Sequence, residues 1–152
     1  MPEIVTVAQR PDLARAIAPW LWTEWERRLG RSLADTTASI AARTAAIGPE
    51  QCFILLDGAE PAATASLYRD DLDDRPDLTP WLAAVFVHPD FRGRGHALRV
   101  IAAVVAACRA AAIPTLWLHT EHAAELYARL GWEALGAADD AGHAVTLMRR
   151  HL

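Results

Sequence analysis

The most informative part of this sequence is WLAAVFVHPDFRGRGHA, which runs from Trp81 to Ala97. It begins with an uninterrupted apolar run, Trp81–Val87, which is typical of a central strand buried on both faces. His88-Pro89-Asp90 ends that strand, and the residues beyond the turn predict a long apolar helix over Ala97–Ala112. We therefore expect a buried strand joined to a helix by a short turn that contains two glycines.

The turn between this strand and this helix has the composition of a phosphate site. Gly93 and Gly95 allow backbone conformations that a Cβ atom would block, so successive N–H groups can point at one spot. The turn also lies at a helix N-terminus, where the positive end of the helix dipole attracts anions. Arg92 and Arg94 add charged donors. A plain turn into a helix stays open as the alternative, because two glycines this close are a weak signal by themselves.

The residues downstream supply a second wall for a long ligand. Pro114–His119 has the pattern of another strand, and Glu121–Leu130 predicts a helix that Gly131 ends. The Tyr127 side chain lies on this second helix. A ligand held by the glycine turn would therefore run between two strand–helix units.

Two short patterns in this region resemble those of a known family. Arg92-x-x-Gly95-x-Ala97, between a strand and a helix, resembles motif A of the GNAT N-acetyltransferases, R/Q-x-x-G-x-G/A. Leu126-Tyr127-x-x-Leu130-Gly131-Trp132 resembles the family's second hallmark, F/L-Y-x-x-L-G-F/Y/W. The two patterns occur in the family's order and spacing. The resemblance is strong over Trp81–Trp132 and rests on element order elsewhere.

The resemblance implies an α/β (α+β) fold with a mixed central sheet flanked by helices. It implies that the sheet splays between the Trp81–Val87 and Pro114–His119 strands, and that acetyl-CoA is the acetyl donor. The pantetheine of acetyl-CoA would hydrogen-bond the backbone near Phe86 and Val87. Its pyrophosphate would bind the amides of Arg92, Gly93, Arg94, Gly95, His96 and Ala97. The His96 side chain, which departs from the small aliphatic residues frequent there, is expected to point to solvent.

The resemblance also implies direct attack of an amine on the thioester, which needs a base and an acid. Tyr127 would lie near the CoA sulfur, and a phenol with a pKa near 10 can donate a proton to a thiolate. Its alternative is an aromatic residue packed in the core. His119, at the end of a strand, is the candidate base, against a plain surface histidine. Glu24 and a relay of waters are other candidates, and His88 is expected to be structural.

A metal site is not expected. His119, Glu121 and His122 lie close together in the sequence, but no third convincing ligand follows at a suitable spacing.

The rest of the chain gives the order β-α-α-β-β-β-α-β-α-β, with one more strand possible at 132–135. Helices are expected over Leu13–Leu29, kinked at Pro19, and over Leu33–Ile47 after an N-cap at Ser32. Asp57-Gly58 predicts the turn of a hairpin. No linker or repeat divides the sequence, so one domain over 1–152 is expected.

The bulk composition excludes other classes of protein. The formal net charge of −4 argues against a nucleic-acid-binding protein. The longest apolar run, Val100–Cys108, is far short of the roughly 20 residues that cross a bilayer. Cys52 and Cys108 are expected as buried free thiols, and Met1–Gln9 shows no signal peptide. We therefore expect a cytoplasmic protein without membrane or nucleic-acid partners, either a monomer or a homodimer.

The leading prediction is an acetyl-CoA-dependent N-acetyltransferase, an acyltransferase that acts on an amine. The alternatives are a noncatalytic acyl-CoA-binding or sensory domain of the same fold, and a nucleotide-binding module. The nucleotide-binding module is disfavoured because no ribose-binding acid follows the turn at the expected distance. The acceptor stays open among proteins, peptides, aminoglycosides, polyamines and small metabolites.

An acidic segment gives a hint about the acceptor. Residues 70–77 precede the central strand, and family topology would put them near the acceptor's entrance. Arg75 alone opposes their charge. The segment is either a solvated loop or an electrostatic funnel for cationic amines; its carboxylates are Asp70, Asp71, Asp73, Asp74 and Asp77.

Overall fold

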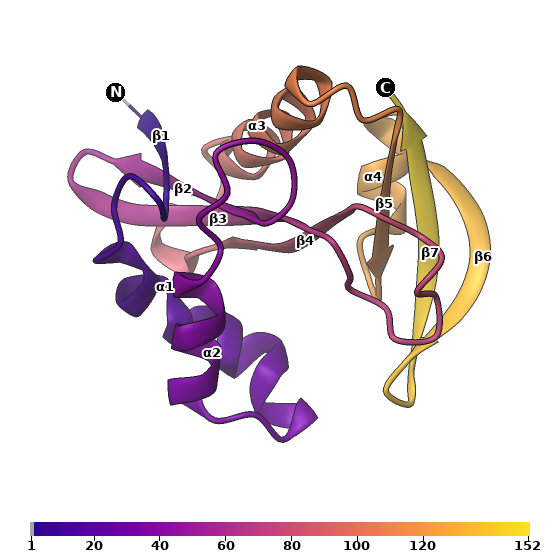
Figure 1. The fold of residues 1–152 in the computed structure, drawn as a ribbon, viewed down its shortest axis with the longest axis horizontal. Helices are drawn as coiled ribbons and strands as arrows, with labels where there is room; N and C mark the ends of the chain where they lie inside the picture. Colours follow the sequence, from indigo (N-terminus) through magenta and orange to yellow (C-terminus); the bar gives the residue numbers. More distant parts are fainter. Residues whose placement is uncertain (1) are drawn as a thin grey trace.

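The computed structural model describes residues 2–152, and within them seven strands form one mixed sheet (Figure 1). The order across the sheet is β1-β2-β3-β4-β5-β7-β6, and the β4–β5 pairing is parallel whereas the others are antiparallel. The strands are β1 (Pro2–Thr6), β2 (Gln51–Asp57), β3 (Glu60–Tyr68), β4 (Trp81–Val87), β5 (Thr115–Thr120), β6 (Glu133–Asp140) and β7 (His143–His151).

Helices cover both faces of this sheet, as the sequence predicts. Alternate residues of β2 point to opposite faces, and they belong to two different cores. Cys52, Ile54 and Leu56 pack with α1 (Leu13–Leu21) and α2 (Leu33–Ala41). Phe53 and Leu55 belong to the core that α3 (His96–Ala110) and α4 (Ala124–Arg129) cover. Figure 1 shows α3 on one side of β2, β3 and β4, with α1 and α2 on the other.

The helix predicted over Leu13–Leu29 is helical throughout but not one α-helix. Pro19 lies inside α1, and the chain then continues as a π-helical turn, η1 (Trp22–Glu26), and a 3₁₀ turn, η2 (Arg27–Leu29). Gly30, with a φ of 81°, ends the segment in the left-handed region. π-Helical turns are rare and are frequent at functional sites.

The predicted N-cap of the second helix is confirmed, because the Asp35 N–H donates to Ser32 Oγ at 3.0 Å. That helix ends at Ala41, earlier than the predicted Ile47. The residues beyond it turn back toward the sheet, where Thr44 forms an isolated bridge with Gln51.

The other expected elements are present with shifted ends. The Asp57-Gly58 hairpin joins β2 to β3, and the strand suggested at 132–135 is the start of the longer β6. Both cysteines are free and buried, as expected. Within residues 2–152 no helix has the length and apolarity needed to cross a bilayer.

The sheet opens between β4 and β5. Their one register pair is Trp81 with Trp117, and the Trp117 N–H donates to Pro80 O at 3.1 Å. Figure 1 shows β4 running across the view and β5 running down it. The expected splay between these strands is therefore present.

A bulge in β4 accompanies this opening. Ser66 and Thr64 of β3 face Ala83 and Phe86 of β4, so β4 carries one extra residue. Ala84 lies in that bulge with a φ of 54°, a conformation that costs a residue with a Cβ about 1 kcal/mol.

The splay also corrects one expectation about β4. The apolar run predicts a strand buried along its whole length, and the Trp81, Leu82 and Ala83 side chains are indeed buried. The residues from Ala84 to Val87 are only half-buried, because β5 no longer lies beside them. The second half of β4 is therefore apolar without being core.

Candidate active site

A cleft of about 1000 Å³ opens at the point where β4 and β5 separate. The bulged part of β4 and the end of β5 contribute to it, and so do η1, α2, the loop after β3, α4 and the β6–β7 turn. Its lining includes Glu24, Trp25, Asp35, Arg43, Tyr68, Asp70, Asp71, Ala83, Ala84, Val85, His119, Thr120, Tyr127 and Asp140.

The edge of β4 that faces the opening is free to bind a ligand. On its other edge, Phe86 and Val87 pair with Thr64 and Ala63 of β3. Toward β5, no residue of the described chain pairs with β4 beyond Trp81. Backbone polar groups in such a position need a partner, so an extended ligand with amide groups fits here.

The glycine turn has the geometry expected of an anion site. Gly93 and Gly95 have φ values of 80° and 78°, which favour glycine, and no atom lies within 4 Å of a Cβ built at either. Gly95 is the N-cap of α3, whose first turn carries no acidic residue. The first amides of α3 lack intrahelical partners, as at any helix N-terminus, and no acidic residue of that turn competes for them.

The arginine side chains of the turn bond to the protein. Arg92 Nε donates to Val87 O at 3.1 Å, and the guanidinium lies 5.7 Å from the Phe86 ring centroid. Arg94 Nη1 donates to Asp57 Oδ2 at 2.8 Å. Both side chains thus connect the turn to the strands around it.

His96 does not point to solvent, contrary to the expectation. Its side chain is buried, and Nε2 lies 3.0 Å from Asp57 Oδ2. Hydrogen bonds from His96 and then Arg94 lower the pKa of the Asp57 carboxyl. His96 is the first residue of α3, and the β2–β3 hairpin beneath it supplies the carboxylate partner that makes burial of an imidazole tolerable. Asp57 thus anchors the glycine turn through two side chains.

We predict that Asp57→Ala lowers Tm by roughly 2–8 °C, because the buried His96 would lose its partner. Asp57→Asn, which keeps an oxygen acceptor, should lower Tm less. Since the folded pKa of Asp57 is lowered, its stabilisation is present at neutral pH and fades as the pH falls below the ordinary value of 3.8. Thermal melts at several pH values check this, and equal Tm values for wild type and Asp57→Ala at pH 7 would contradict it.

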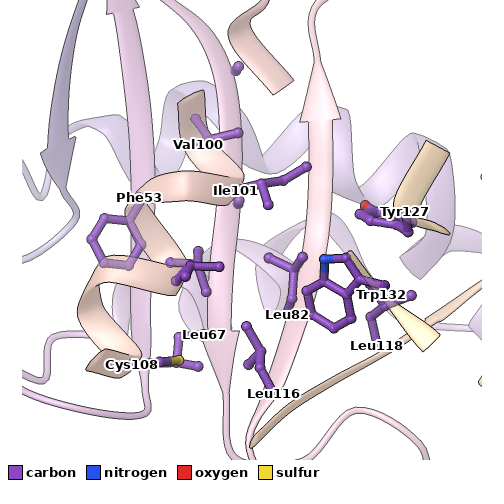
Figure 2. Close-up of a cluster of buried hydrophobic side chains, with 14 of the residues drawn as sticks. Phe53, Leu67, Leu82, Val100, Ile101, Cys108, Leu116, Leu118, Tyr127 and Trp132 are labelled. Atoms are coloured by element: carbon purple, nitrogen blue, oxygen red, sulfur yellow. The ribbon is translucent and has the colours of Figure 1, made fainter. Parts of the chain in front are cut away.

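Tyr127 lies on α4 with its ring in the core and at the cleft. It is 7% exposed, and its ring meets Trp132 edge-on with centroids 5.9 Å apart. Figure 2 shows its side chain extending from α4 toward β4. Burial raises the pKa of the Tyr127 hydroxyl to about 12, so it keeps its proton at any physiological pH. The packing role and the donor role are therefore compatible in one side chain.

His119 lines the same cleft and has two carboxylate neighbours. Nε2 lies 2.9 Å from Asp71 Oδ2, and Nδ1 lies 4.0 Å from Asp140 Oδ2. Burial by itself would lower the pKa of His119, but the hydrogen bond and charge of Asp71, with the charge of Asp140, outweigh it and raise the pKa above 6.5. The structure therefore brings His119 and Tyr127 to one cleft.

The other candidates have different environments. Glu24 is exposed at the cleft wall. His88 lies outside the cleft, where its Nδ1 accepts from the Asp90 N–H at 3.1 Å and its ring packs against Trp20. His122 is 90% exposed beside Glu121. Within residues 2–152, no three His, Cys, Asp or Glu side chains gather as a metal site.

The cysteines are unsuited to a covalent mechanism. Cys52 and Cys108 are both fully buried, and neither lines the cleft. Burial raises the pKa of both thiols, that of Cys108 to about 11. A thiolate nucleophile is therefore not available at this site.

The cleft is strongly acidic. Its guanidinium groups are already paired, Arg28 with Glu121, Arg31 with Glu26, and Arg43 with Glu50. Over the part of the chain that the structure describes, the lining carboxylates without an arginine partner are Glu24, Asp35, Asp70, Asp71, Asp73 and Asp140. Of the acidic segment, Asp74 and Asp77 lie outside the lining, and Asp77 pairs with Arg75 at 2.9 Å.

Sequence reasoning misses part of this lining. Asp140 and Asp35 come from β6 and α2, far from the recognised motifs, and neither has a local signal. The role of Asp71 beside His119 was equally hidden, since 48 positions separate the two residues.

Known proteins resemble this chain in sequence pattern and in fold. Residues 14–132 match the model of the Acetyltransferase (GNAT) family. No curated protein matches the chain. Solved structures do match the chain. Their sequence identities to it are so low that these matches establish only the fold.

The crystal structure of an aminoglycoside 6'-N-acetyltransferase complexed with coenzyme A aligns with a TM-score of 0.76 and 15% identity, over 98% of this chain and 96% of that one. Aminoglycoside 6'-acetyltransferase type Ii gives 0.75 and 17%, with the same coverage of 98% and 96%. An acetyltransferase from Streptococcus agalactiae 2603 gives 0.69 and 19%, over 99% and 98%. Since the family match spans most of the sequence and the fold agrees over 98% of the chain, this chain belongs to the GNAT acetyltransferase family.

Proposed function

We propose that this protein is an acetyl-CoA-dependent N-acetyltransferase whose acceptor is a cationic amine. The observation that carries the proposal is that His119, Tyr127 and an excess of carboxylates line one cleft, beside the unpaired edge of β4. Family membership supports the acyl transfer, and the acidic lining supports the choice of acceptor.

The residues present suit acetyl-CoA as the donor. The free edge of β4 near Phe86 and Val87 offers backbone partners to the amides of a pantetheine arm. The turn from Arg92 to Ala97 offers amides to the pyrophosphate, with Asp57 holding that turn from behind. When bound, acetyl-CoA supplies the thioester carbonyl that the amine attacks.

The residues of the cleft have complementary roles in this reaction. An alkyl ammonium has a pKa of about 10 and must lose a proton before it attacks. His119 accepts that proton, because it is the half-buried imidazole of the cleft and lies beside two carboxylates that stabilise its protonated form. Tyr127, which stays protonated, donates to the departing sulfur. The buried thiols take no part, which supports direct transfer from donor to amine.

Release of free CoA, detected with a thiol reagent, tests the proposal. The purified chain is incubated with acetyl-CoA and a panel of diamines, polyamines, aminoglycosides, lysine-containing peptides and small neutral-tailed amines. We expect turnover with cationic members, and mass spectrometry should find the acetyl group on nitrogen. Binding of acetyl-CoA without CoA release from any amine would instead favour a noncatalytic sensory domain.

A matched pair of acceptors isolates the effect of charge. 1,4-Diaminobutane and 4-amino-1-butanol share a reacting amine and a chain length but differ in the second cation. We expect the diamine to have the lower KM, and we expect salt to raise its KM as the Debye length falls from about 10 Å at 0.1 M to about 3 Å at 1 M. If the two amines have equal KM values, and if salt leaves the KM of the diamine unchanged, the electrostatic funnel is contradicted.

The carboxylates themselves give the corresponding mutational test. Changing Asp35, Asp70 and Asp73 together to Asn should raise the diamine's KM by roughly 10-fold without altering acetyl-CoA binding. The control is a triple variant with the same charge change at exposed positions outside the cleft: Glu3→Gln, Glu60→Gln and Asp74→Asn. Steady-state kinetics of the two triples decide the matter, and an equal effect of both would attribute the change to net charge alone.

A further inference from the structure

We propose that Asp71 fixes His119 so that its Nδ1 is the proton-accepting atom, and that the acceptor's reacting ammonium binds between His119 Nδ1 and Asp140. This inference deepens the proposed function and rests on it. It assigns two residues from distant segments, the loop after β3 and the end of β6, to the reaction.

The contacts at Nε2 determine which ring nitrogen carries the proton. Nε2 lies 2.9 Å from Asp71 Oδ2 and 3.1 Å from Asp71 O. The backbone oxygen can only accept, so Nε2 must be the donor. The carboxylate oxygen accepts in the same way when ionised, a form that the His119 hydrogen bond favours although burial raises the pKa of Asp71. The neutral imidazole therefore has its proton on Nε2 and its lone pair on Nδ1. The Trp81 ring, edge-on at 5.9 Å between centroids, holds the imidazole in place.

The lone pair on Nδ1 faces a second carboxylate across a gap. Asp140 Oδ2 is 4.0 Å away, too far for a direct hydrogen bond. Two acceptors that share one tetrahedral nitrogen at about 2.8 Å each lie roughly 4.5 Å apart. The gap is therefore close to the width that an ammonium needs to donate to both atoms.

The chemistry of this arrangement balances. The ammonium gives one proton to Nδ1 and keeps a hydrogen bond to Asp140. Its lone pair then forms the C–N bond while the C–S bond breaks, and the electron pair of that bond leaves on sulfur. Tyr127 gives the sulfur a proton, and the second proton that nitrogen loses on becoming an amide replaces it. One proton is released overall, first to His119 and then to solvent.

The surrounding charges support the same roles. The charged groups that face the imidazole are Asp71 from the loop and Asp140 from β6, and both stabilise the imidazolium that forms. Glu26 of η1 is near Asp71 and is paired with Arg31. The acidic limb of kcat/KM should accordingly lie above pH 6.5, since His119 must be neutral to accept a proton.

Nitrogen-15 NMR of the full chain tests the assignment without requiring turnover. In the wild type, the His119 resonances should report the proton on Nε2. Asp71→Asn and Asp71→Ala should both lower the His119 pKa, because the charge that stabilises the imidazolium is gone. Adding 1,4-diaminobutane should shift His119 Nδ1 in the wild type and much less in Asp140→Asn. A proton on Nδ1, or equal shifts in both proteins, would overturn the proposal.

Kinetics with the best acceptor of the panel give the second test. Asp71→Asn should move the acidic limb of kcat/KM to lower pH and lower kcat by roughly 10-fold. Asp140→Asn should raise the acceptor's KM about 10-fold while the thermal shift by acetyl-CoA stays unchanged. Asp74→Asn, in the same loop but outside the cleft, should behave as wild type.

The two tests separate the failure of each idea. If the wild type is active and Asp71→Asn leaves the acidic limb of kcat/KM at the same pH, Asp71 only holds its loop in place and does not act on His119. An inactive wild type across the whole panel would contradict the proposed function, and the NMR results would then still decide whether Asp71 and Asp140 act on His119 as stated.

Discussion

Tyr127→Phe should lower kcat by roughly 10²–10⁴ while acetyl-CoA binding changes little. The substitution removes one hydroxyl and keeps the ring that packs edge-on against Trp132, so the core around α4 should persist. Burial raises the pKa of the hydroxyl to about 12, so under the proposed function it still holds its proton when the sulfur departs. Its loss leaves the departing sulfur without that donor.

Tyr68→Phe is the matched control for this prediction. Tyr68 lines the same cleft, and burial raises its pKa to about 12 as well, but its ring lies under Arg43, with the guanidinium 3.7 Å from the ring centroid. Its variant should keep most of the turnover. CoA-release kinetics and thermal shifts of both variants provide the comparison, and wild-type turnover in Tyr127→Phe would leave Tyr127 as a packing residue.

Gly95→Glu should abolish the stabilisation by acetyl-CoA. A ligand at 100 times its Kd stabilises a native protein by about 2.7 kcal/mol, which corresponds to a Tm increase of roughly 5–10 °C in a chain of this size. The new side chain would enter the open space in front of the turn, bring a negative charge to the first amides of α3, and strain a backbone with a φ of 78°. Repulsion of the pyrophosphate and loss of the turn geometry act together.

Gly30→Glu separates these local effects from general ones. Gly30 is exposed, has a φ of 81°, and has no atom within 4 Å of a built Cβ, so the strain and the added charge are the same. It ends η2, away from the glycine turn. Both variants should melt at a lower temperature, but Gly30→Glu should keep the acetyl-CoA shift. If folded Gly95→Glu also keeps it, the pyrophosphate binds elsewhere.

Local patterns in the sequence predicted most of the fold. The apolar run of β4 coincides with the strand from Trp81 to Val87, and the Asp57-Gly58 pair marks a real hairpin. These features depend on neighbouring residues, which a sequence displays directly. Less predictable were the π-helical turn after Leu21 and the early end of α2 at Ala41, because packing against the sheet and the bridge of Thr44 to Gln51 decide them.

The site divides in the same way. Tyr127 and the glycine turn belong to patterns with fixed spacing, so their positions were predictable. The carboxylates that contact His119 and His96 were not predictable from local patterns. Asp71, Asp140 and Asp57 reach these imidazoles from other strands and loops. The solvent exposure expected of His96 was wrong for that reason: the carboxylate that allows its burial is 39 positions away in the sequence.

The narrow junction between β4 and β5 has a consequence for cooperativity. One register pair, Trp81 with Trp117, joins the β1–β4 half of the sheet to the β5–β7–β6 half. Regions with few contacts open locally at a lower cost than the rest of a protein, so the backbone hydrogen bonds of the two halves can open with some independence, even though one apolar core spans both. A donor lying in the opening would bridge them, and hydrogen exchange across the whole sheet, including amides far from the ligand, would slow on binding. Under the proposed function, the donor would take the structural place of the missing strand contacts.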